Sequence, residues 1–328
     1  MVSGRDWSAE VELLCDLMSR YYLDGDVADR VSQVLRRRLD EGAYRKAADE
    51  SAFAEVVTAD TIAASGDLHV RLRYSREALP ERDTMIVPES GRDPEEAAMT
   101  GHGFVRVERL SGNIGLVDIR RFWPLSMSRH AAIAAMHLIA DTNVLVIDLR
   151  RSWGGEPEMV SFLCSYLFDE RVHLNDLYFP VEDKTTQWWT DPSVPGPTFG
   201  GTKPVYVLIS KVTFSAAEEF CYDLQQQGRA VLVGETTAGA ANFDYRYRVS
   251  EQLMFSVPSG YPVNPVSGRG WEGTGVEPDL AVDPDQAFDR AHKLALDHVI
   301  SHGAEGHRRT VFEEATKERN GYKTHRRR

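Results

Sequence analysis

The sequence predicts an α/β protein with a largely parallel sheet and an additional helical region at its N-terminal end. Apolar residues keep helical spacing through residues 7–65, so we expect an N-terminal helical domain over 1–66. From residue 114 to residue 233, short apolar runs alternate with amphipathic stretches, which is the pattern of βαβ crossovers. The run at 144–149 is almost entirely apolar, which is typical of a strand covered on both faces.

The elements of the core, expected over residues 67–300, follow from the same patterns. Apolar and polar residues alternate from Asp67 onward, which predicts a strand with His69 on its polar face. Residues 80–101 are rich in Pro and charged residues and have no apolar period, so a loop or linker is expected there. Further strands are expected at 114–119, 144–149, 204–209, 231–233 and 245–257, helices at 128–140, 157–168 and 286–300, a Gly- and Pro-rich loop at 260–275, and a polar, basic C-terminal tail over 301–328.

Composition and charge exclude several classes of partner. The chain has 38 Lys and Arg against 50 Asp and Glu, a net charge of −12, which argues against nucleic acid or an anionic membrane surface as the main partner. No apolar stretch reaches the roughly 18 residues of a membrane span, and the N-terminus lacks the apolar segment of a signal peptide. We therefore expect a cytoplasmic protein. Its three cysteines, Cys15, Cys164 and Cys221, suit buried reduced thiols better than disulfides or a metal site.

A serine stands where the apolar run at 204–209 gives way to a helical pattern. The segment is Thr213-Phe-Ser215-Ala-Ala-Glu218. Ser215 lies there among backbone N–H groups that no carbonyl has claimed, which suits an acyl-transfer nucleophile with the Ala216 N–H as an oxyanion donor. The same residues also fit a capping box, in which Ser215 and Glu218 only cap the helix. Both interpretations stay open on this segment alone.

A glycine pair and one histidine extend the hypothesis of a nucleophile. Gly154 and Gly155 follow the strand at 144–149, so their N–H groups can approach a substrate carbonyl without a Cβ in the way. A turn that needs positive φ is the alternative. Among ten histidines, His69 stands at the junction of the helical domain and the core, where clefts form. An exposed strand histidine is the alternative for this position.

Four segments, taken in order, resemble one family. They are Asp148-Leu-Arg-Arg-Ser-Trp-Gly154-Gly155, Thr213-Phe-Ser215-Ala-Ala-Glu218, Gly234-Glu-Thr-Thr237 and Trp271-Glu272-Gly-Thr-Gly-Val276-Glu-Pro-Asp279. Over about residues 67–300 the chain is similar to the C-terminal-processing (tail-specific) serine peptidase family, in its tricorn-core and interphotoreceptor-retinoid-binding-protein-like branch. The resemblance implies a Clp-protease/crotonase-like α/β core.

The resemblance also implies how the serine is activated. Processing peptidases of the family carry a lysine base 25 positions after the serine, but Ala240 stands at this position and no lysine occurs over residues 212–292. The tricorn-like arrangement, in which an earlier histidine is the base and a late glutamate orients it, is matched by His69 and Glu272. In this arrangement Ser215 attacks, His69 takes and returns the proton, and Glu272 holds the imidazolium.

The sequence therefore predicts a serine hydrolase of the peptidase type that cleaves peptides or unfolded segments through an acyl-enzyme. No metal or cofactor is expected, and assembly into a homo-oligomer is left open. Two alternatives remain: a non-catalytic protein that holds apolar ligands on the same scaffold, and an ester or thioester hydrolase or acyltransferase with the same triad. The last shares the tetrahedral oxyanion with peptide cleavage, so its chemistry cannot be separated from the residues alone.

Overall fold

The structure is a computed structural model that describes residues 5–79, 85–86 and 94–325. The chain forms two compact units. Unit 1 comprises residues 1–92, 176–186 and 240–263, and unit 2 comprises residues 93–175, 187–239 and 264–328. These units do not follow the expected division at residues 66 and 300, because two later segments of the chain return to the N-terminal region and pack there.

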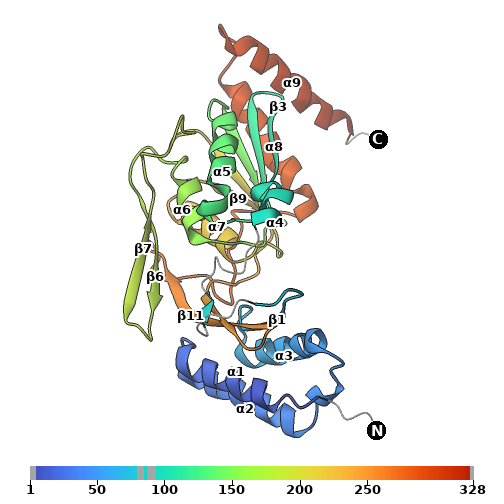
Figure 1. Ribbon diagram of the computed structural model, residues 1–328. Coiled ribbons are helices and arrows are strands. Elements are labelled where there is room, and N and C mark those ends of the chain that lie inside the picture. Colours follow the sequence, from blue (N-terminus) through green and yellow to red (C-terminus); the bar gives the residue numbers. More distant parts are fainter. Residues whose placement is uncertain (1–4, 80–84, 87–93, 326–328) are drawn as a thin grey trace. The chain divides into compact units, whose positions relative to one another are not determined.

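Unit 1 begins with the predicted helices. They are α1 (Ser8–Tyr21), α2 (Gly25–Asp40) and α3 (Glu50–Ser65), with a short 3₁₀ turn η1 (Tyr44–Lys46) before α3. Asp24 and Asp49 cap α2 and α3 by accepting backbone N–H groups of the first turn. The predicted apolar stripes are buried, with Val11, Leu14 and Val31 fully inaccessible. Helices α1 and α2 lie side by side, and α3 lies against strand β1 (Figure 1).

The helices of unit 1 pack on an antiparallel sheet. Its strands are β1 (Arg71–Tyr74), β2 (Met85–Ile86), β6 (His173–Phe179), β7 (Lys184–Trp189), β10 (Phe243–Arg248) and β11 (Leu253–Val263). Strand β11 pairs antiparallel with β1, β10 and β6, which confirms the antiparallel strands expected near 245–257. It continues to Val263 because its last residues pair with β6, so the expected loop at 260–275 begins later than predicted.

Unit 2 contains the predicted parallel sheet. Its strands are β3 (Phe104–Leu110), β4 (Ile114–Ile119), β5 (Val144–Asp148), β8 (Val205–Ile209), β9 (Val231–Gly234) and β12 (Leu280–Ala281), in the order β12-β9-β8-β5-β4-β3. All neighbouring pairs are parallel except β3 with β4. Strand β5 is buried at all five positions, as expected for a strand covered on both faces.

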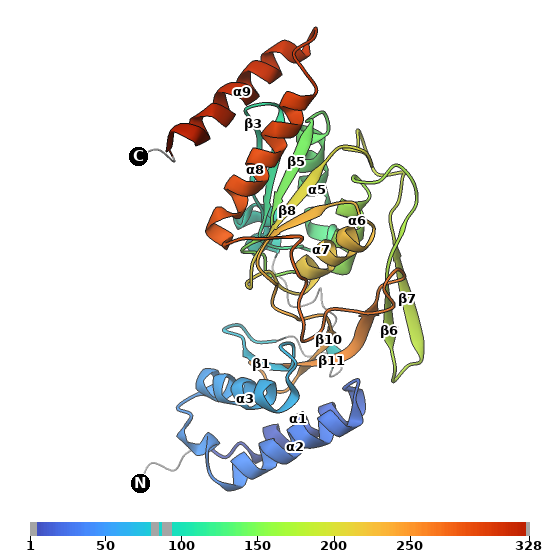
Figure 2. The same cartoon turned by 180° about the vertical axis from the view of Figure 1, so that it is seen from behind.

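Helices cover both faces of this sheet (Figure 2). They are α5 (Leu125–Ile139), α6 (Pro157–Cys164), α7 (Ala216–Gln226), α8 (Pro284–Ser301) and α9 (Arg308–His325). Side chains of the central strands, such as Val146 and Leu208, pack with Ala291 and Leu296 of α8 in one core cluster. The alternation of strands and helices read from the sequence is therefore confirmed, and α6 ends four residues before the predicted end at 168.

Two terminal and connecting segments differ from expectation. The described part of the expected loop at 80–101 contains β2 and the helix α4 (Pro94–Met99), followed by the 3₁₀ turn η3 (Gly101–Gly103). The expected tail at 301–328 contains α9, because Ala315 is fully buried and Val311 packs against the cluster that α8 shares with the sheet. Residues 80–84, 87–93 and 326–328 lie outside the described residues.

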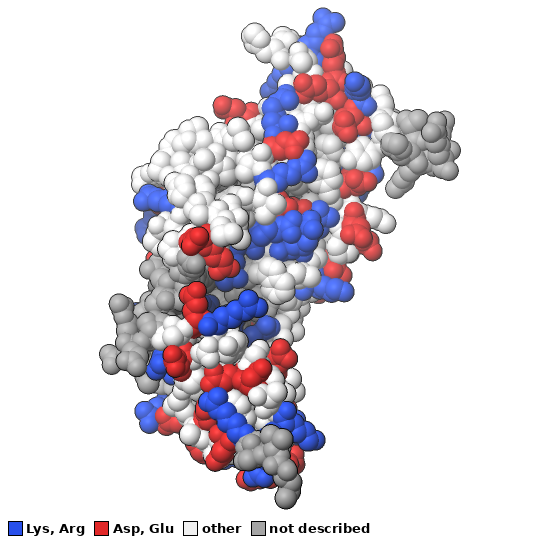
Figure 3. Space-filling view, turned by 45° about the vertical axis from the view of Figure 1, so that its right-hand side comes forward, with Lys and Arg blue, Asp and Glu red and all other residues white. Residues whose placement is uncertain are grey.

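The charged surface and the cysteines agree with what the composition predicts. On the face drawn in Figure 3, basic and acidic side chains are interspersed over the described surface. The three cysteines are free and buried, as predicted. None of the helices in the described part of the chain combines the length and the apolar character that a membrane span requires.

Candidate active site

The loop that carries Ser215 is fixed to the exit of strand β5. The Thr213 hydroxyl donates to the Leu149 carbonyl at 2.9 Å, and the Ser210 hydroxyl donates to the Arg150 carbonyl at 2.6 Å. The Phe214 N–H donates to the Ser152 carbonyl at 3.2 Å. Because β5 and β8 are parallel neighbours, their carboxyl-terminal loops meet at one edge of the sheet, and these bonds lock the two loops together.

Ser215 has a strained backbone. Its φ of 53° and ψ of −125° lie where residues with a Cβ are rare, and it is the residue immediately before α7. A serine on a sharp, strained turn between strand and helix is the geometry of a nucleophile elbow. The predicted position of Ser215 at a strand-to-helix junction is therefore correct, and the strain is a feature that a plain cap does not need.

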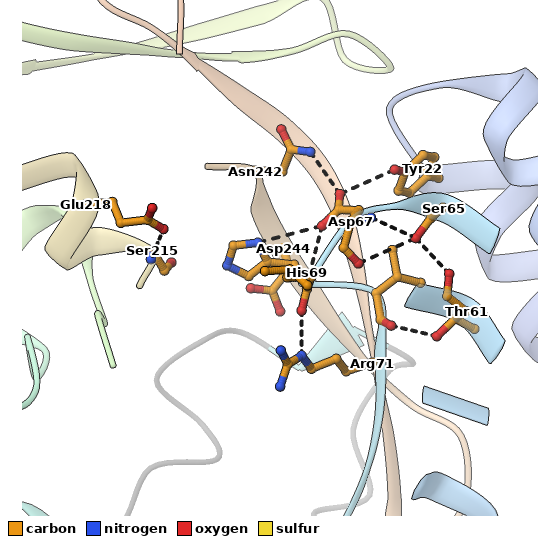
Figure 4. A network of polar contacts seen from close by, with 12 residues as sticks. Tyr22, Thr61, Ser65, Asp67, His69, Arg71, Ser215, Glu218, Asn242 and Asp244 are labelled. Carbon is orange, nitrogen blue, oxygen red and sulfur yellow. Dashed lines mark hydrogen bonds and ion pairs between the residues drawn. The ribbon is translucent and has the colours of Figure 1, made fainter. Parts of the chain in front are cut away.

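Glu218 holds this strained turn from within unit 2. Its carboxylate is fully buried and accepts the Ser215 N–H at 2.8 Å, the Thr237 hydroxyl at 2.6 Å and the Gly239 N–H at 2.7 Å. The Ser215 and Glu218 pair is drawn in Figure 4. A capping box requires that the glutamate accept the N–H of the capping serine, and Glu218 does so. The same residues therefore form both a helix cap and a nucleophile elbow.

The glycine pair lies against the Ser215 turn. A Cβ added to Gly154 would lie 2.5 Å from the Phe214 carbonyl oxygen and 2.8 Å from the Ala216 nitrogen. A Cβ added to Gly155 would lie 1.9 Å from the Phe122 carbonyl oxygen, because the two residues form a parallel bridge. Both glycines have positive φ, 73° and 150°. Close backbone approach, as well as the turn, therefore requires glycine here.

Gly154, Gly155 and Ala216 carry three backbone N–H groups at this edge of the sheet. Within the described residues, neither Gly154, Gly155 nor Ala216 donates its backbone N–H to a protein acceptor. Ala216 is the first residue of α7, so its N–H belongs to the orphan donors at a helix start. N–H groups beside a serine hydroxyl can stabilise an oxyanion that forms when the hydroxyl attacks a carbonyl.

The turn that carries Glu272 is tied to the same framework. The Gly273 N–H donates to the Gly239 carbonyl at 2.9 Å, and Gly239 in turn donates to Glu218. Trp271 is buried and packs on Tyr222 of α7, with ring centroids 5.3 Å apart. Unit 2 thus holds Ser215, Ala216, both glycines and the backbone of the Glu272 turn in one hydrogen-bonded frame.

His69 belongs to unit 1 and differs from expectation. It lies in a turn before β1 rather than on the strand, and only 4% of its surface is exposed. The predicted polar face of a strand is therefore wrong for this residue, and so is the alternative of an exposed histidine. The reason is local: the Asp67 carboxylate accepts the His69 N–H at 2.8 Å, which turns the backbone before pairing starts.

Carboxylates surround the His69 ring. Asp67 Oδ1 lies 3.8 Å from His69 Nδ1, and Asp67 Oδ2 accepts the Asn242 side-chain amide at 2.8 Å and the Tyr22 hydroxyl at 3.3 Å (Figure 4). Burial lowers the pKa of His69, while the negative charges of Asp244 and Asp67 oppose that change. The ring is therefore neutral at pH 7 and able to accept a proton.

Asp244 is itself kept ionised. Burial alone would raise its pKa, but the charge of Arg246, and that of His69 when the ring is protonated, hold the pKa at about 2. Asp67, Asn242 and Asp244, which the structure places around His69, were not singled out from the sequence. Asp67 had a signal, since an aspartate two residues before a turn residue forms an Asx turn. The other two come from a segment some 170 residues later, and no local pattern connects them to His69.

Comparison with known proteins places the chain in a family. The family model "Peptidase family S41" matches residues 113–282, and the model "N-terminal domain of Peptidase_S41 in eukaryotic IRBP" matches residues 5–100. The first match covers just over half of the 328 residues. It includes Ser215, the glycine pair and Glu272, whereas the second includes His69.

Solved structures agree on the fold. Mature CPAF complexed with lactacystin has 12% sequence identity and a TM-score of 0.61, with 92% of this chain and 100% of that chain covered. The photosystem II D1 C-terminal processing protease has 15% identity and a TM-score of 0.51, with 85% and 94% covered. The tricorn protease has 12% identity and a TM-score of 0.55, with 89% of this chain and 36% of that chain covered.

The similarity to these solved structures supports the fold, and the match to the family model identifies the class of enzyme. The predicted α/β core of the Clp-protease/crotonase type with an N-terminal helical region is confirmed. Since the matched model spans the strained serine turn and the parallel sheet that holds it, the chain belongs to peptidase family S41 and is a serine-type peptidase.

Proposed function

We propose that this peptidase cleaves peptides or unfolded polypeptide segments through an acyl-enzyme, with Ser215 as nucleophile, His69 as base and Glu272 as the residue that orients His69. The main support is the Ser215 turn, where a strained serine lies beside Gly154 and immediately before Ala216. The backbone N–H groups of these two residues have no acceptor in the part of the chain that the structure describes. Free N–H donors occur at every helix start, but helix capping does not need a strained serine backbone. The strain together with donors that a glycine pair leaves accessible favours a nucleophile with an oxyanion hole.

In the proposed reaction, Ser215 Oγ bonds to the carbonyl carbon of the scissile peptide while His69 accepts the hydroxyl proton. The carbonyl oxygen becomes an oxyanion, which is stabilised by the N–H of Ala216 and that of Gly154 or Gly155. His69 then protonates the leaving amine. A water molecule, deprotonated by the same histidine, hydrolyses the acyl-enzyme and restores Ser215.

Two carboxylates in unit 1 support His69 in this proposal. Asp67 and Asp244 favour the imidazolium that forms when His69 accepts the proton, because an opposite charge stabilises the charged form. The Asn242 amide and the Tyr22 hydroxyl donate to Asp67 and keep its carboxylate in place. The proposed assignment of Glu272 rests on the match of its motif to the tricorn-like arrangement and on the anchoring of its turn to the Ser215 frame.

Covalent labelling tests the nucleophile. A fluorophosphonate probe should label the wild-type chain at Ser215, and Ser215→Ala should abolish labelling while the fold is kept. Ser152→Ala is the matched control, because Ser152 lies beside the glycine pair and its buried hydroxyl has no hydrogen-bond partner in the described structure. Undiminished labelling of Ser215→Ala would reduce Ser215 to a helix cap.

Digestion of a peptide library with mass-spectrometric readout tests the substrate class. Cleavage of peptides by the wild type and not by Ser215→Ala supports the proposal. Turnover confined to ester or thioester substrates would favour the hydrolase or acyltransferase alternative, and saturable binding of apolar ligands without turnover would favour the binding-protein alternative. The cytoplasmic location and assembly into a homo-oligomer stay predictions, which fractionation of cells and light scattering would test.

A further inference from the structure

A second site lies in unit 2 at the edge of the parallel sheet that is opposite to Ser215. A cavity of about 150 Å³ is lined by Asn143, Lys203, His298, His302, Arg308 and Phe312, among others. Asn143 immediately precedes β5, and Lys203 precedes β8 by two residues. These are the amino-terminal ends of the strands whose carboxyl-terminal ends lead to the glycine pair and to Ser215, so the cavity is separate from the candidate active site.

The lining of this cavity is basic. Four of its side chains are Lys, His or Arg, and none of the lining residues in the described part of the chain is Asp or Glu. This concentration is unexpected in a chain with a net charge of −12. The cavity also lies at the N-terminus of α9, an 18-residue helix that begins at Arg308. The positive end of the helix dipole therefore adds to the charge of the side chains.

The C-terminal end of α8 also lies at this cavity and carries the negative end of its helix dipole, which hydrogen bonds to its last carbonyls partly offset. The last carbonyls of α8 already accept hydrogen bonds: the His298 carbonyl from the Ser301 hydroxyl at 2.7 Å and from His302 Nδ1 at 2.8 Å, and the Val299 carbonyl from the His302 N–H. With Nδ1 used in this way, His302 is held by its own helix end and its second ring nitrogen stays available for a ligand.

The basic groups also oppose one another's charge. Burial and the neighbouring His302 lower the pKa of His298. Burial and the charge of Arg229 lower the pKa of Lys203, and Asp141 opposes this change. The acid next to His298 in sequence, Asp297, is paired with Arg319 at 2.7 Å on α9. An anion in the cavity would relieve this repulsion, because an opposite charge favours each protonated form.

We propose that this cavity binds a small dianionic oxyanion, a sulfate or phosphate group, held by the basic side chains that line it. The volume suits a group of this size rather than a drug-sized ligand. The contributing elements are the start of α9, the end of α8 and the loop before β8, so the bound anion joins the C-terminal helix to the sheet. A bound anion also favours the protonated form of His298, so binding is tighter at lower pH.

Titration of the full chain with sulfate, followed by calorimetry, tests the site. Sulfate stays a dianion from pH 6 to pH 8, so any change in affinity with pH belongs to the protein. Arg308→Ala should weaken binding about tenfold or more, because it removes a charge-assisted hydrogen bond to the anion. The matched control is Arg309→Ala. Arg309 is the next residue, is exposed and pairs with Glu313 at 3.1 Å, and it does not line the cavity.

Sulfate also stabilises folded proteins without binding to a site, because it is excluded from their surface. This general effect is the same in both variants, so a difference in affinity between them reports binding at the cavity. Equal affinity in Arg308→Ala and Arg309→Ala would overturn the site, as would unsaturable binding. Affinity that stays constant from pH 6 to pH 8, or that changes equally in the His298→Gln, His302→Gln double variant, would overturn the role of the histidines. Equal affinity for acetate would overturn the assignment to a dianion.

Affinities measured at one fixed pH distinguish the two possible sources of the bound phosphate group. Inorganic phosphate and glycerol 3-phosphate carry the same head group, and the cavity accepts either in this proposal. Tighter binding of the ester assigns the site to a phosphorylated metabolite, and tighter binding of the free ion assigns it to inorganic phosphate. Weaker binding of both than of acetate would overturn the proposal. Protection of α9 amides from hydrogen exchange on sulfate addition is expected, and its absence would contradict the link to the C-terminal helix.

Discussion

A buried pair of carboxyl groups on the helix that follows Ser215 makes stability depend on pH. Glu219 is 5% exposed and Asp223 is fully buried, and they lie one turn apart on α7. Burial raises the pKa of Glu219 to about 8, with Glu156 adding to the effect and Asn175 opposing it. Burial and the charge of Glu219 also raise the pKa of Asp223. We predict that folding is weakened as these groups ionise.

The sign and the size follow from the linkage between proton binding and folding. A carboxyl with a pKa of about 8 in the folded chain and 4.5 as its ordinary value keeps its proton longer when folded. Its contribution to stability is complete below pH 4.5 and is lost as the pH rises through 8. The loss approaches about 1.4 kcal/mol per pH unit for one proton and totals on the order of 5 kcal/mol. Because the two groups interact, the slope belongs to the pair.

Glu219→Gln is the perturbation, because the amide keeps the shape of the side chain and cannot ionise. The free energy of unfolding, measured by urea denaturation at intervals from pH 5 to pH 8.5, should fall more steeply for the wild type than for the variant. Glu158→Gln, on the exposed side of α6 in the same unit, is the control and should parallel the wild type. Parallel curves for wild type and Glu219→Gln would refute the reasoning.

Three further predictions concern catalysis. Gly154→Ala should lower kcat by on the order of 10² or more, because its Cβ would push against the Ser215 turn; Gly228→Ala, which has a similar positive φ and open space around it, should leave kcat unchanged in the same assay. The value of kcat/KM should rise with pH through an inflection below 6.5, the ordinary pKa of a histidine, because burial lowers the pKa of His69. Asp67→Asn removes a negative charge that favours the imidazolium, so it should move the inflection lower still. An aspartate with a purely structural role would not move it. Glu272→Gln should lower kcat by orders of magnitude in a folded chain if Glu272 balances the imidazolium, and wild-type kcat/KM in this variant would remove it from the triad.

Features that local patterns encode could be predicted from the amino-acid sequence. Helical and alternating apolar periods fixed the helices of the N-terminal region and the parallel strands of the core, because each period leaves one face to bury. The position of Ser215 between β8 and α7 followed from the end of an apolar run and the start of a helical one. The family resemblance followed from four short motifs, each a turn or a strand exit whose backbone demands particular residues.

Features that depend on segments far apart in the chain became visible in the folded structure. The alternation after Asp67 predicted that His69 lies on the polar face of a strand, yet the ring lies buried in a turn. Residues some 170 positions later return to it: Asn242, just before β10, donates to Asp67, and Asp244 of β10 lies near the ring. The helix α9 in place of a polar tail has the same cause, since Val311, Ala315 and Tyr322 pack against the cluster that α8 shares with the sheet. Periodicity records which face of a segment is apolar; which other segment covers that face is set by the packing of the whole chain.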